Sequence, residues 1–390
     1  ETAIIERMEQ VMAPLDYDMA CSVHAYLREQ GVGLVLGESV AGFTPDESGL
    51  RVGLESGGSL PADLVILAIG VQPDTALAKD AGLKLGLKGS IAVNDRMQTS
   101  DPDIYAVGDA VESTHFVSGE KTLAALAGPA NKQGRIAADH ICGRESRYSG
   151  VQGSAVLKLF GMTVAATGLN EAAARAAGIA FDKTVTFSAS HATYYPGASN
   201  MTVKTLFSPE TGRLLGAQIV GFSGVDKRID VLAAAVRMGM TGEALTELEL
   251  SYAPPYSSAK DPVNMAGYVI ENIRSGLVGQ YHWHDVADLP RDGSVILLDT
   301  RTPAEYQNGH IEGAINLPLG ELRERLHELE RGKPVYVNCH SGLRSYIACR
   351  ILMQNGFECY NLSGGYRFYA IVMQERLDHR PAYPCGLPIQ

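Results

Sequence analysis

Hydrophobic and polar positions along the first 70 residues follow the periods of strands and helices in turn. The pattern predicts a strand at Thr2–Ile5, a helix at Asp16–Gln30, a strand at Val32–Leu36, and hairpin turns at Thr44–Gly49 and Glu55–Gly58. The next segment, Asp63–Gly70, is a continuous apolar run. Such a run is typical of a strand covered on both faces. Strands that alternate with a helix in this way predict an α/β sheet.

In the rest of the chain the order of predicted strands and helices changes twice, which predicts further domains. Residues 72–150 predict a strand at Ile104–Val107 and a helix at Pro129–Ile141. The next segment predicts strands at Ala155–Leu159, Met201–Phe207 and Leu214–Gly221 and helices at Asn170–Ala177, Val225–Met238 and Thr241–Glu247. The last block predicts short strands at Val295–Asp299 and Val335–Asn338 with helices between them. We expect domain boundaries that give residues 1–71, 72–150, 151–278 and 279–390.

Composition excludes several classes of protein. With 390 residues the chain is long enough for two or three domains, and its net charge of −11 argues against a nucleic-acid partner. No apolar stretch approaches the ~20 residues that span a bilayer, so we expect no membrane partner. Six cysteines without CxxC spacing indicate neither a disulfide framework nor a zinc site, and we expect no metal. A reducing cytoplasm is the expected compartment, since no signal peptide opens the chain.

The segment Thr99–Asp109 is the clearest motif of the first half. Pro102 shapes a turn, the expected strand follows, and Gly108 permits close approach of a ligand to the backbone. Asp109 then sits at the carboxyl end of that strand, where open α/β sheets bind ligands. Its carboxylate can accept a hydrogen bond from a sugar-like hydroxyl. The alternative for an isolated Gly-Asp pair is an aspartate that caps the next helix.

This segment resembles the second flavin-binding motif of the FAD-dependent pyridine nucleotide–disulfide oxidoreductases, and the resemblance extends through Leu126–Arg135. The resemblance implies that FAD is bound by Thr99, Gly108, Asp109, Ala127, Pro129, Ala130 and Asn131. It also implies that Glu6, at the end of a strand, binds the adenosine ribose of NADH or NADPH, with a mild preference for NADH because an acid repels a 2′-phosphate. The segment around Gly70 resembles the crossover back to the flavin domain.

The family's two GxGxxG fingerprints are missing from these 390 residues. In the family both fingerprints and the redox-active cysteine precede the strand that ends at Glu6. The chain also starts at Glu1, directly in an apolar run. We therefore expect this sequence to be the C-terminal portion of a longer polypeptide, and we expect it not to hold FAD tightly on its own.

Two loops rich in tyrosine and proline stand out in the third segment, at His191–Ala198 and Tyr252–Pro262. Rigid loop packing would explain them equally well if taken alone. Together they resemble the dimerisation domain of the coenzyme A-disulfide reductases. The resemblance implies a homodimer in which Tyr252 and either Tyr194 or Tyr195 contact the reacting sulfur, with Tyr194 preferred, and in which Lys260 meets a phosphate of coenzyme A.

A cysteine loop follows the strand at Val335–Asn338. Cys339 stands at a strand–helix junction, where converging backbone N–H groups and the positive end of a helix favour a thiolate. The loop residues Ser341, Gly342 and Leu343 would surround a substrate sulfur. Four residues separate Cys339 from Arg344, a loop better suited to a single sulfur atom than to a phosphate.

Residues 281–374 resemble the rhodanese family, on the segments Leu298–Tyr306, Gly309–Pro318 and Leu362–Gly365 as well as the cysteine loop. We expect Cys339 and Arg344 to be catalytic and His310 to be structural, bonded within its turn. Three other cysteines are expected in packing roles, namely Cys142, Cys349 and Cys359. For Cys359 a role as a resolving thiol is the alternative.

The combined resemblance implies an α/β protein with the remnants of two nucleotide-binding three-layer domains, an α+β dimerisation domain and an α/β rhodanese domain. It implies an FAD-dependent NAD(P)H reductase of sulfur–sulfur bonds in small molecules (coenzyme A disulfide, coenzyme A persulfide or polysulfide). Cys339 would carry or deliver sulfane sulfur. Three alternatives stay open: a rhodanese domain that only docks substrate, a stand-alone sulfurtransferase, and an inactive sensor.

Overall fold

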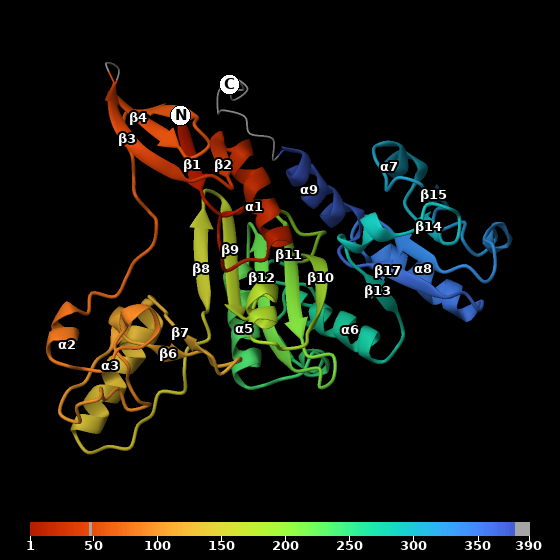
Figure 1. Ribbon diagram of the computed structural model, residues 1–390. Coiled ribbons are helices and arrows are strands. Elements are labelled where there is room, and N and C mark those ends of the chain that lie inside the picture. Colours follow the sequence, from red (N-terminus) through yellow and green to blue (C-terminus); the bar gives the residue numbers. More distant parts are fainter. Residues whose placement is uncertain (47–48, 379–390) are drawn as a thin grey trace.

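The structure is a computed structural model that describes residues 1–46 and 49–378. The two largest sheets of the described residues have five strands each (Figure 1). Part of the hairpin turn expected at Thr44–Gly49 lies outside the described residues, and so does Cys385. No described helix combines the length and the apolar character that crossing a bilayer requires.

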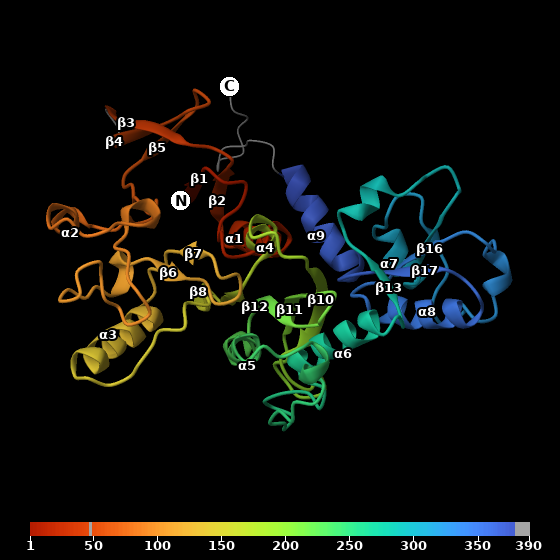
Figure 2. The same ribbon diagram turned by 60° about the horizontal axis from the view of Figure 1, so that its bottom comes forward.

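The first large sheet is antiparallel, with the strand order β10-β11-β12-β9-β8. Its strands are β8 (Ala155–Leu159), β9 (Met162–Gly168), β10 (Asp182–Ala189), β11 (Asn200–Phe207) and β12 (Leu214–Gly221). Helix α4 (Glu171–Ala176) connects β9 to β10, with Asn170 capping its first turn. The sheet is the central layer of the molecule, since helices cover both of its faces (Figures 1 and 2).

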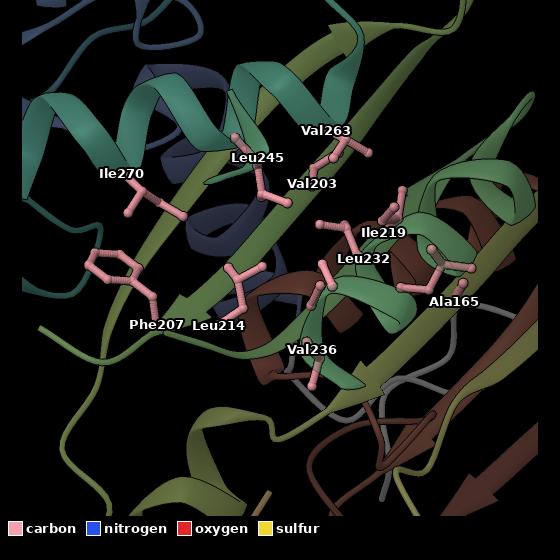
Figure 3. Packing of buried hydrophobic residues seen from close by; sticks show 14 of the residues in the cluster. Ala165, Val203, Phe207, Leu214, Ile219, Leu232, Val236, Leu245, Val263 and Ile270 are labelled. Atoms are coloured by element: carbon pink, nitrogen blue, oxygen red, sulfur yellow. The ribbon is translucent and has the colours of Figure 1, made fainter. Parts of the chain in front are cut away.

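Helices α5 (Val225–Arg237) and α6 (Pro262–Arg274) cover one face of this sheet. Phe207, Ile219 and Leu232 belong to the buried cluster between the layers (Figure 3). Each fully buried side chain of this size contributes roughly 1.5–3 kcal/mol by leaving water. The cluster therefore gives the antiparallel sheet a stable core of its own.

Helix α1 (Tyr17–Glu29) packs on the opposite face. Its Met19 and Val23 join Val164 and Val220 of the sheet in a second buried cluster. Phe368, which lies almost 350 residues along the chain from Met19, is part of the same cluster and is 1% exposed. The C-terminal domain therefore shares a hydrophobic core with the rest of the molecule.

Around α1 lie two small sheets. Strands β1 (Thr2–Glu6) and β2 (Val32–Leu36) pair in parallel, and β3 (Val40–Asp46), β4 (Gly49–Leu54) and β5 (Ser59–Ala62) form an antiparallel meander. An extended connection leads on to residues 76–150 (Figure 1). That segment holds α2 (Ala76–Asp80), 3₁₀ turns at Leu87–Gly89 and Gly108–Ala110, the strand pair β6 (Ser113–Thr114) and β7 (Lys121–Thr122), and α3 (Ala127–Ile141).

Two predicted strands are wrong. Residues 63–70 form no strand, and Ile66 and Ile69 are 80% and 90% exposed. Residues 104–107 are likewise irregular apart from a single bridge between Gln98 and Tyr105. A strand exists only where a neighbouring strand accepts and donates its backbone hydrogen bonds. None of the described strands lies beside either segment, so their apolar pattern has no sheet to join.

The second large sheet is parallel throughout, with the order β13-β17-β16-β14-β15. Its strands are β13 (Gly279–Tyr281), β14 (Ile296–Asp299), β15 (Ile315–Asn316), β16 (Val335–Asn338) and β17 (Cys359–Leu362). Helices α7 (Pro303–Gln307), α8 (Leu343–Gln354) and α9 (Gly365–Asp378) accompany it, with 3₁₀ turns at Asp285–Asp288 and Leu326–Glu328. In both views α9 runs beside α1.

The remaining sequence predictions hold with small shifts of the ends, except at one helix. Thr241–Glu247 forms only a 3₁₀ turn at Glu243–Leu245. Strands β9 and β10 and helix α6 were absent from the prediction. Helix α6 starts at a capping box formed by Asp261 and Asn264, a local signal that the sequence does contain.

Candidate active site

Cys339 lies directly after β16, beneath the first turn of α8. Its side chain is 1% exposed. The backbone N–H of Gly342 donates to its Sγ at 3.1 Å and the hydroxyl of Ser345 donates to it at 3.2 Å. Two donors aimed at one sulfur atom stabilise negative charge there. The loop therefore forms a cradle for a sulfur anion, with the amide of Gly342 turned toward the sulfur.

Glycines permit this tight loop. Gly342 adopts a φ of +99°, in the region that favours glycine. Gly365, at the start of α9, packs so closely that an added Cβ would lie 2.7 Å from the carbonyl oxygen of Cys339. The N–H of Tyr366 donates to that carbonyl at 2.7 Å. The first turn of α9 therefore fixes the loop from behind.

Arg344 is engaged by Glu305 of α7. Its Nη1 and Nη2 donate to the two carboxylate oxygens at 2.8 and 2.6 Å. This contact, with hydrogen bonds from Thr302, lowers the pKa of Glu305 to about 2. The positive charge of Arg344 is thus compensated at the edge of the loop, while Ser341 is partly buried and Leu343 is 59% exposed. The pairing of Arg344 with Glu305 was not predicted from the sequence.

The structure also places the histidine and the three cysteines for which the sequence predicted structural roles. His310 bonds the carbonyl of Tyr306 at 3.0 Å and stacks on its ring, which confirms the prediction of a structural histidine. Cys349 and Cys359 are buried next to each other in the core behind α8, and Cys359 Sγ donates to the carbonyl of Cys349. Cys142 is exposed after α3, so its predicted burial is wrong. It lies beyond the apolar face of that helix.

The structure brings together two of the tyrosines singled out in the sequence. The hydroxyls of Tyr194 and Tyr252 are 3.1 Å apart, and this hydrogen bond raises the pKa of Tyr252. Tyr195 points elsewhere and packs edge-on against His191. Lys260 is exposed on the second loop. The pair of neighbouring phenols favours Tyr194 over Tyr195.

Arg228 of α5 joins the two tyrosine loops and was not anticipated. It is 2% exposed, and its guanidinium donates to the carbonyl of Ser190 at 2.9 Å and to Asp261 Oδ2 at 2.9 Å. It also reaches Ser257 and the carbonyl of Tyr256. The signal in the sequence is an arginine within an otherwise apolar helix face. Arg228 therefore positions both loops.

The residues assigned to flavin binding surround the start of α3. Gly108 has a φ of +81° and donates its N–H to Gln133 Oε1 at 2.8 Å, while Asp109 is exposed and has no partner among the described residues. No side chain caps the first turn of α3, at Ala127. Beside it, Pro129 helps to line a cavity of about 310 Å³. Free helix N–H groups and an unpaired carboxylate fit a group that offers both acceptors and hydroxyls.

Five further predicted positions are placed as follows. Thr99 bonds within its turn, accepting from the N–H of Asp101. Ala130 lies next to Gly108, and Asn131 is exposed on the same turn of α3. Glu6 ends β1 and accepts from the N–H of Met8 at 2.9 Å. Gly70 is exposed in the extended connection, and no hydrogen bond of the described residues joins it to Glu6.

A buried charge network fastens α1 to both large sheets. Lys204 of β11 is fully buried and contacts Asp16, Asp18 and Glu171 at 2.6–2.9 Å. The indole of Trp283 donates to Asp18 Oδ2 at 3.1 Å. These contacts link the C-terminal domain to the antiparallel sheet.

A second buried contact joins α1 to α9. His24 Nδ1 lies 3.0 Å from Glu375 Oε1, and Arg28 donates to the same carboxylate. The Nε2 of His24 accepts from the N–H of Val11, so Nδ1 carries the proton that is shared with Glu375. Helix α9, and with it the Cys339 loop, is thus held in a fixed position relative to α1 and the antiparallel sheet.

Comparison with known families matches all three parts of the chain. Residues 1–134 match the pyridine nucleotide-disulphide oxidoreductase model, residues 154–262 match the dimerisation domain of that family, and residues 282–370 match the rhodanese-like domain. The solved structure of reduced CoADR-RHD from Bacillus anthracis is 46% identical, with a TM-score of 0.93 over 96% of this chain and 67% of that chain. The chain belongs to the pyridine nucleotide-disulphide oxidoreductase family. The expected fold class and family are confirmed.

Other similar members of this family carry names from sulfur and oxygen chemistry. A NAD-dependent persulfide reductase from A. fulgidus is 40% identical, with a TM-score of 0.86 over 94% of this chain and 66% of that one. A curated NADH oxidase of Methanocaldococcus jannaschii is 37% identical over 68% of this chain and 59% of its own length. A CoA-dependent NAD(P)H sulfur oxidoreductase of Pyrococcus furiosus is 35% identical over 69% and 60%. The chain spans about three fifths of these curated relatives.

Proposed function

We propose that this protein is an FAD-dependent NAD(P)H reductase of sulfur–sulfur bonds in which Cys339 carries sulfane sulfur. The observation that carries the proposal is the cradle at Cys339, where Gly342 and Ser345 both donate to Sγ. That cradle belongs to a chain in which residues 1–134 and 154–262 match the pyridine nucleotide-disulphide oxidoreductase family and its dimerisation domain. Coenzyme A disulfide, coenzyme A persulfide and polysulfide are the proposed substrates, in line with the names of the similar proteins.

Cys339 would take up sulfur by attack of its thiolate on a sulfane sulfur. A bond forms between Sγ and that sulfur, the substrate's sulfur–sulfur bond breaks, and the electron pair leaves with the departing anion. The persulfide anion that results is stabilised by the N–H of Gly342 and the hydroxyl of Ser345. Because the side chain is 1% exposed, only a narrow sulfur chain reaches it, and a bulky partner surface does not.

The first half of the chain would hold the redox groups. FAD supplies two-electron chemistry when bound. The carboxylate of Asp109 would accept from its hydroxyls, while Thr99, Gly108, Ala130 and Asn131 line the same turn. The free N–H groups at Ala127 would meet acceptor atoms beside Pro129. Glu6 would bind the ribose of NAD(P)H, with Gly70 in the crossover, and the acid favours NADH over NADPH.

The tyrosine loops would complete a reducing site across a twofold axis. Tyr252 and Tyr194 would donate hydrogen bonds to a leaving thiolate, and Lys260 would meet a phosphate of coenzyme A. Only the dimerisation-domain match supports the homodimer itself. We propose the domain divisions 1–71, 72–150, 151–278 and 279–390 and a cytoplasmic location, where free cysteines such as Cys339 stay reduced.

The test is Cys339→Ser in the full-length protein, assayed for sulfide release from polysulfide with NADH or NADPH as reductant. We expect turnover to fall at least tenfold, together with loss of a protein-bound persulfide detected by mass spectrometry. Cys142→Ser, at an exposed cysteine, is the matched control and should leave both signals intact. Unchanged turnover in Cys339→Ser would refute the relay and favour a docking or sensor role. A purified protein without a flavin spectrum would refute the reductase assignment.

A further inference from the structure

Ser345 of α8 donates to the active-site sulfur, but its hydroxyl has a second acceptor within reach. Its Oγ lies 3.2 Å from Cys339 Sγ and 3.1 Å from the carbonyl oxygen of Gly342. A serine hydroxyl carries a single proton, so it donates fully to only one of these two acceptors at a time. The strength of the cradle at Cys339 therefore depends on what else satisfies the carbonyl of Gly342.

Two other groups already donate to that carbonyl oxygen. The backbone N–H of Tyr346 reaches it at 3.0 Å within the first turn of α8, and the side-chain Nδ2 of Asn361 reaches it at 3.2 Å from strand β17. A carbonyl oxygen has two lone pairs, and these two donors occupy both. The proton of Ser345 is therefore needed at the sulfur and is redundant at the carbonyl.

The side chain of Asn361 is oriented for its donor group. Its Oδ1 is buried and has no hydrogen-bond partner among the described residues. The reverse orientation of the amide would set Oδ1 against the carbonyl oxygen of Gly342, so that two acceptors would face each other. A buried acceptor without a donor destabilises a fold, and an apolar side chain of the same size would avoid that cost. The useful contact of Asn361 is thus the one that Nδ2 makes.

The sheet holds this donor in place beneath the loop. Asn361 lies beside Val337 of β16, two residues before Cys339. An added Cβ on Gly342 would lie 3.7 Å from the carbonyl oxygen of Leu362, the residue that follows Asn361. The backbones of the loop and of β17 are therefore in van der Waals reach of each other, and a short side chain is enough to join them.

We propose that Asn361 is a positioning residue that directs the single proton of Ser345 to Cys339 Sγ by occupying the second lone pair of the Gly342 carbonyl. Without this donor the hydroxyl would divide its time between the carbonyl oxygen and the sulfur. The thiolate would then lose part of one of its two hydrogen bonds. This inference rests on the proposed function of Cys339, because sulfur uptake starts from the thiolate.

The test measures how the labelling of Cys339 by methyl methanethiosulfonate depends on pH in the full-length protein. The thiolate takes the methylthio group of this slender reagent, the sulfur–sulfur bond of the reagent breaks, and methanesulfinate leaves with the electron pair. The rate is read from the modified Cys339 peptide by mass spectrometry. In Asn361→Leu we expect the pH of half-maximal rate to rise by about 0.7 of a unit, so that the rate below that pH falls about fivefold.

A matched control removes a similar hydrogen bond from the other end of α8. The Nδ2 of Asn355 donates to the carbonyl oxygen of Ile351 at 2.8 Å, so Asn355→Leu should cost one amide–carbonyl contact and leave the labelling profile as in the wild type. Asn361→Ala leaves a gap instead of an apolar side chain and should give the same shift as Asn361→Leu. An unshifted profile in both Asn361 variants, or an equal shift in Asn355→Leu, would overturn the proposal.

A double variant separates an effect through Ser345 from a loss of packing in the loop. Ser345→Ala removes the proton that Asn361 directs and should shift the profile at least as far as Asn361→Leu does. Ser345→Ala/Asn361→Leu should then match Ser345→Ala alone, since two residues that act through one hydrogen bond are not additive. Additive shifts would refute the positioning role. The labelling needs no turnover, so a wild-type protein without Cys339-dependent sulfide release would refute the proposed function and leave this comparison decisive.

Discussion

Replacing Lys204 with methionine would leave three carboxylates facing each other in the interior. Lys204 Nζ lies 2.6 Å from Asp18, 2.6 Å from Glu171 and 2.9 Å from Asp16. Burial lowers the pKa of Lys204, but the carboxylates outweigh it and raise that pKa above its ordinary value. The methionine preserves the length of the apolar stem, so the change removes charge with little loss of volume.

The expected loss of stability depends on the hydrogen-bond partners that each carboxylate retains after Lys204 is replaced. Glu171 retains Lys183 at 2.7 Å and Asp16 retains the amide of Gln218, whereas Asp18 keeps, among the described residues, only the indole N–H of Trp283. Breaking a buried ion pair by removing one partner costs about 3–5 kcal/mol. We expect a loss of about 4 kcal/mol in the free energy of unfolding, a factor of roughly a thousand in the equilibrium constant.

The assay is urea denaturation followed by the fluorescence of Trp283, which is the chain's single tryptophan and contacts Asp18 directly. Lys183→Met is the control, because it removes a cation from Glu171 while leaving Lys204 in place, and should cost about half as much. Adding Asp18→Asn to Lys204→Met should recover part of the loss by removing the least supported charge. A loss below about 1 kcal/mol for Lys204→Met, or no recovery in the double variant, would refute the reasoning.

Three further predictions follow from other parts of the structure. Tyr194→Phe should slow reduction of coenzyme A disulfide several-fold in steady-state assays while Tyr195→Phe has little effect; the reverse order would contradict the hydroxyl geometry. Gly365→Ala should abolish persulfide formation, as judged by mass spectrometry, because its Cβ would collide with the carbonyl of Cys339. Glu375→Gln should cost about 3 kcal/mol at pH 7. Burial raises the pKa of Glu375, but His24 and Arg28 outweigh burial and hold that pKa at about 2. The wild-type protein should therefore lose this stability as the pH falls from about 4.3 toward 2. Unfolding curves of the wild type and Glu375→Gln that coincide at pH 7 would refute the prediction.

The cysteine loop was predictable because all of its determinants are local. A strand, a cysteine, small residues and a helix start follow one another within a few positions, and the structure places Gly342 and Ser345 on the sulfur accordingly. The helices beginning at Tyr17 and Ala127 were predictable for the same reason, since apolar periodicity along a helix is a local property.

The errors and omissions arise where partners are distant in the chain. The apolar runs at 63–70 and 104–107 indicate burial, but a continuous apolar run cannot say whether a neighbouring strand is present. The polar residues Asp18, His24 and Arg28 suggest a solvated helix face, yet all three contact residues between 186 and 351 positions away. The pairing of Arg344 with Glu305 similarly joins two helices, and no local pattern in the sequence predicts it.

The position of Phe368 and Glu375 on α9 bears on how this protein could be divided. Excising residues 279–390 would uncover Met19 and Val23 and leave His24 without its carboxylate. Residues 279–378 are therefore packed into the molecule rather than tethered to it as an independent domain. The two parts share one hydrophobic interior, so heating should unfold them in a single transition, and a substitution in that interior should change the stability of both.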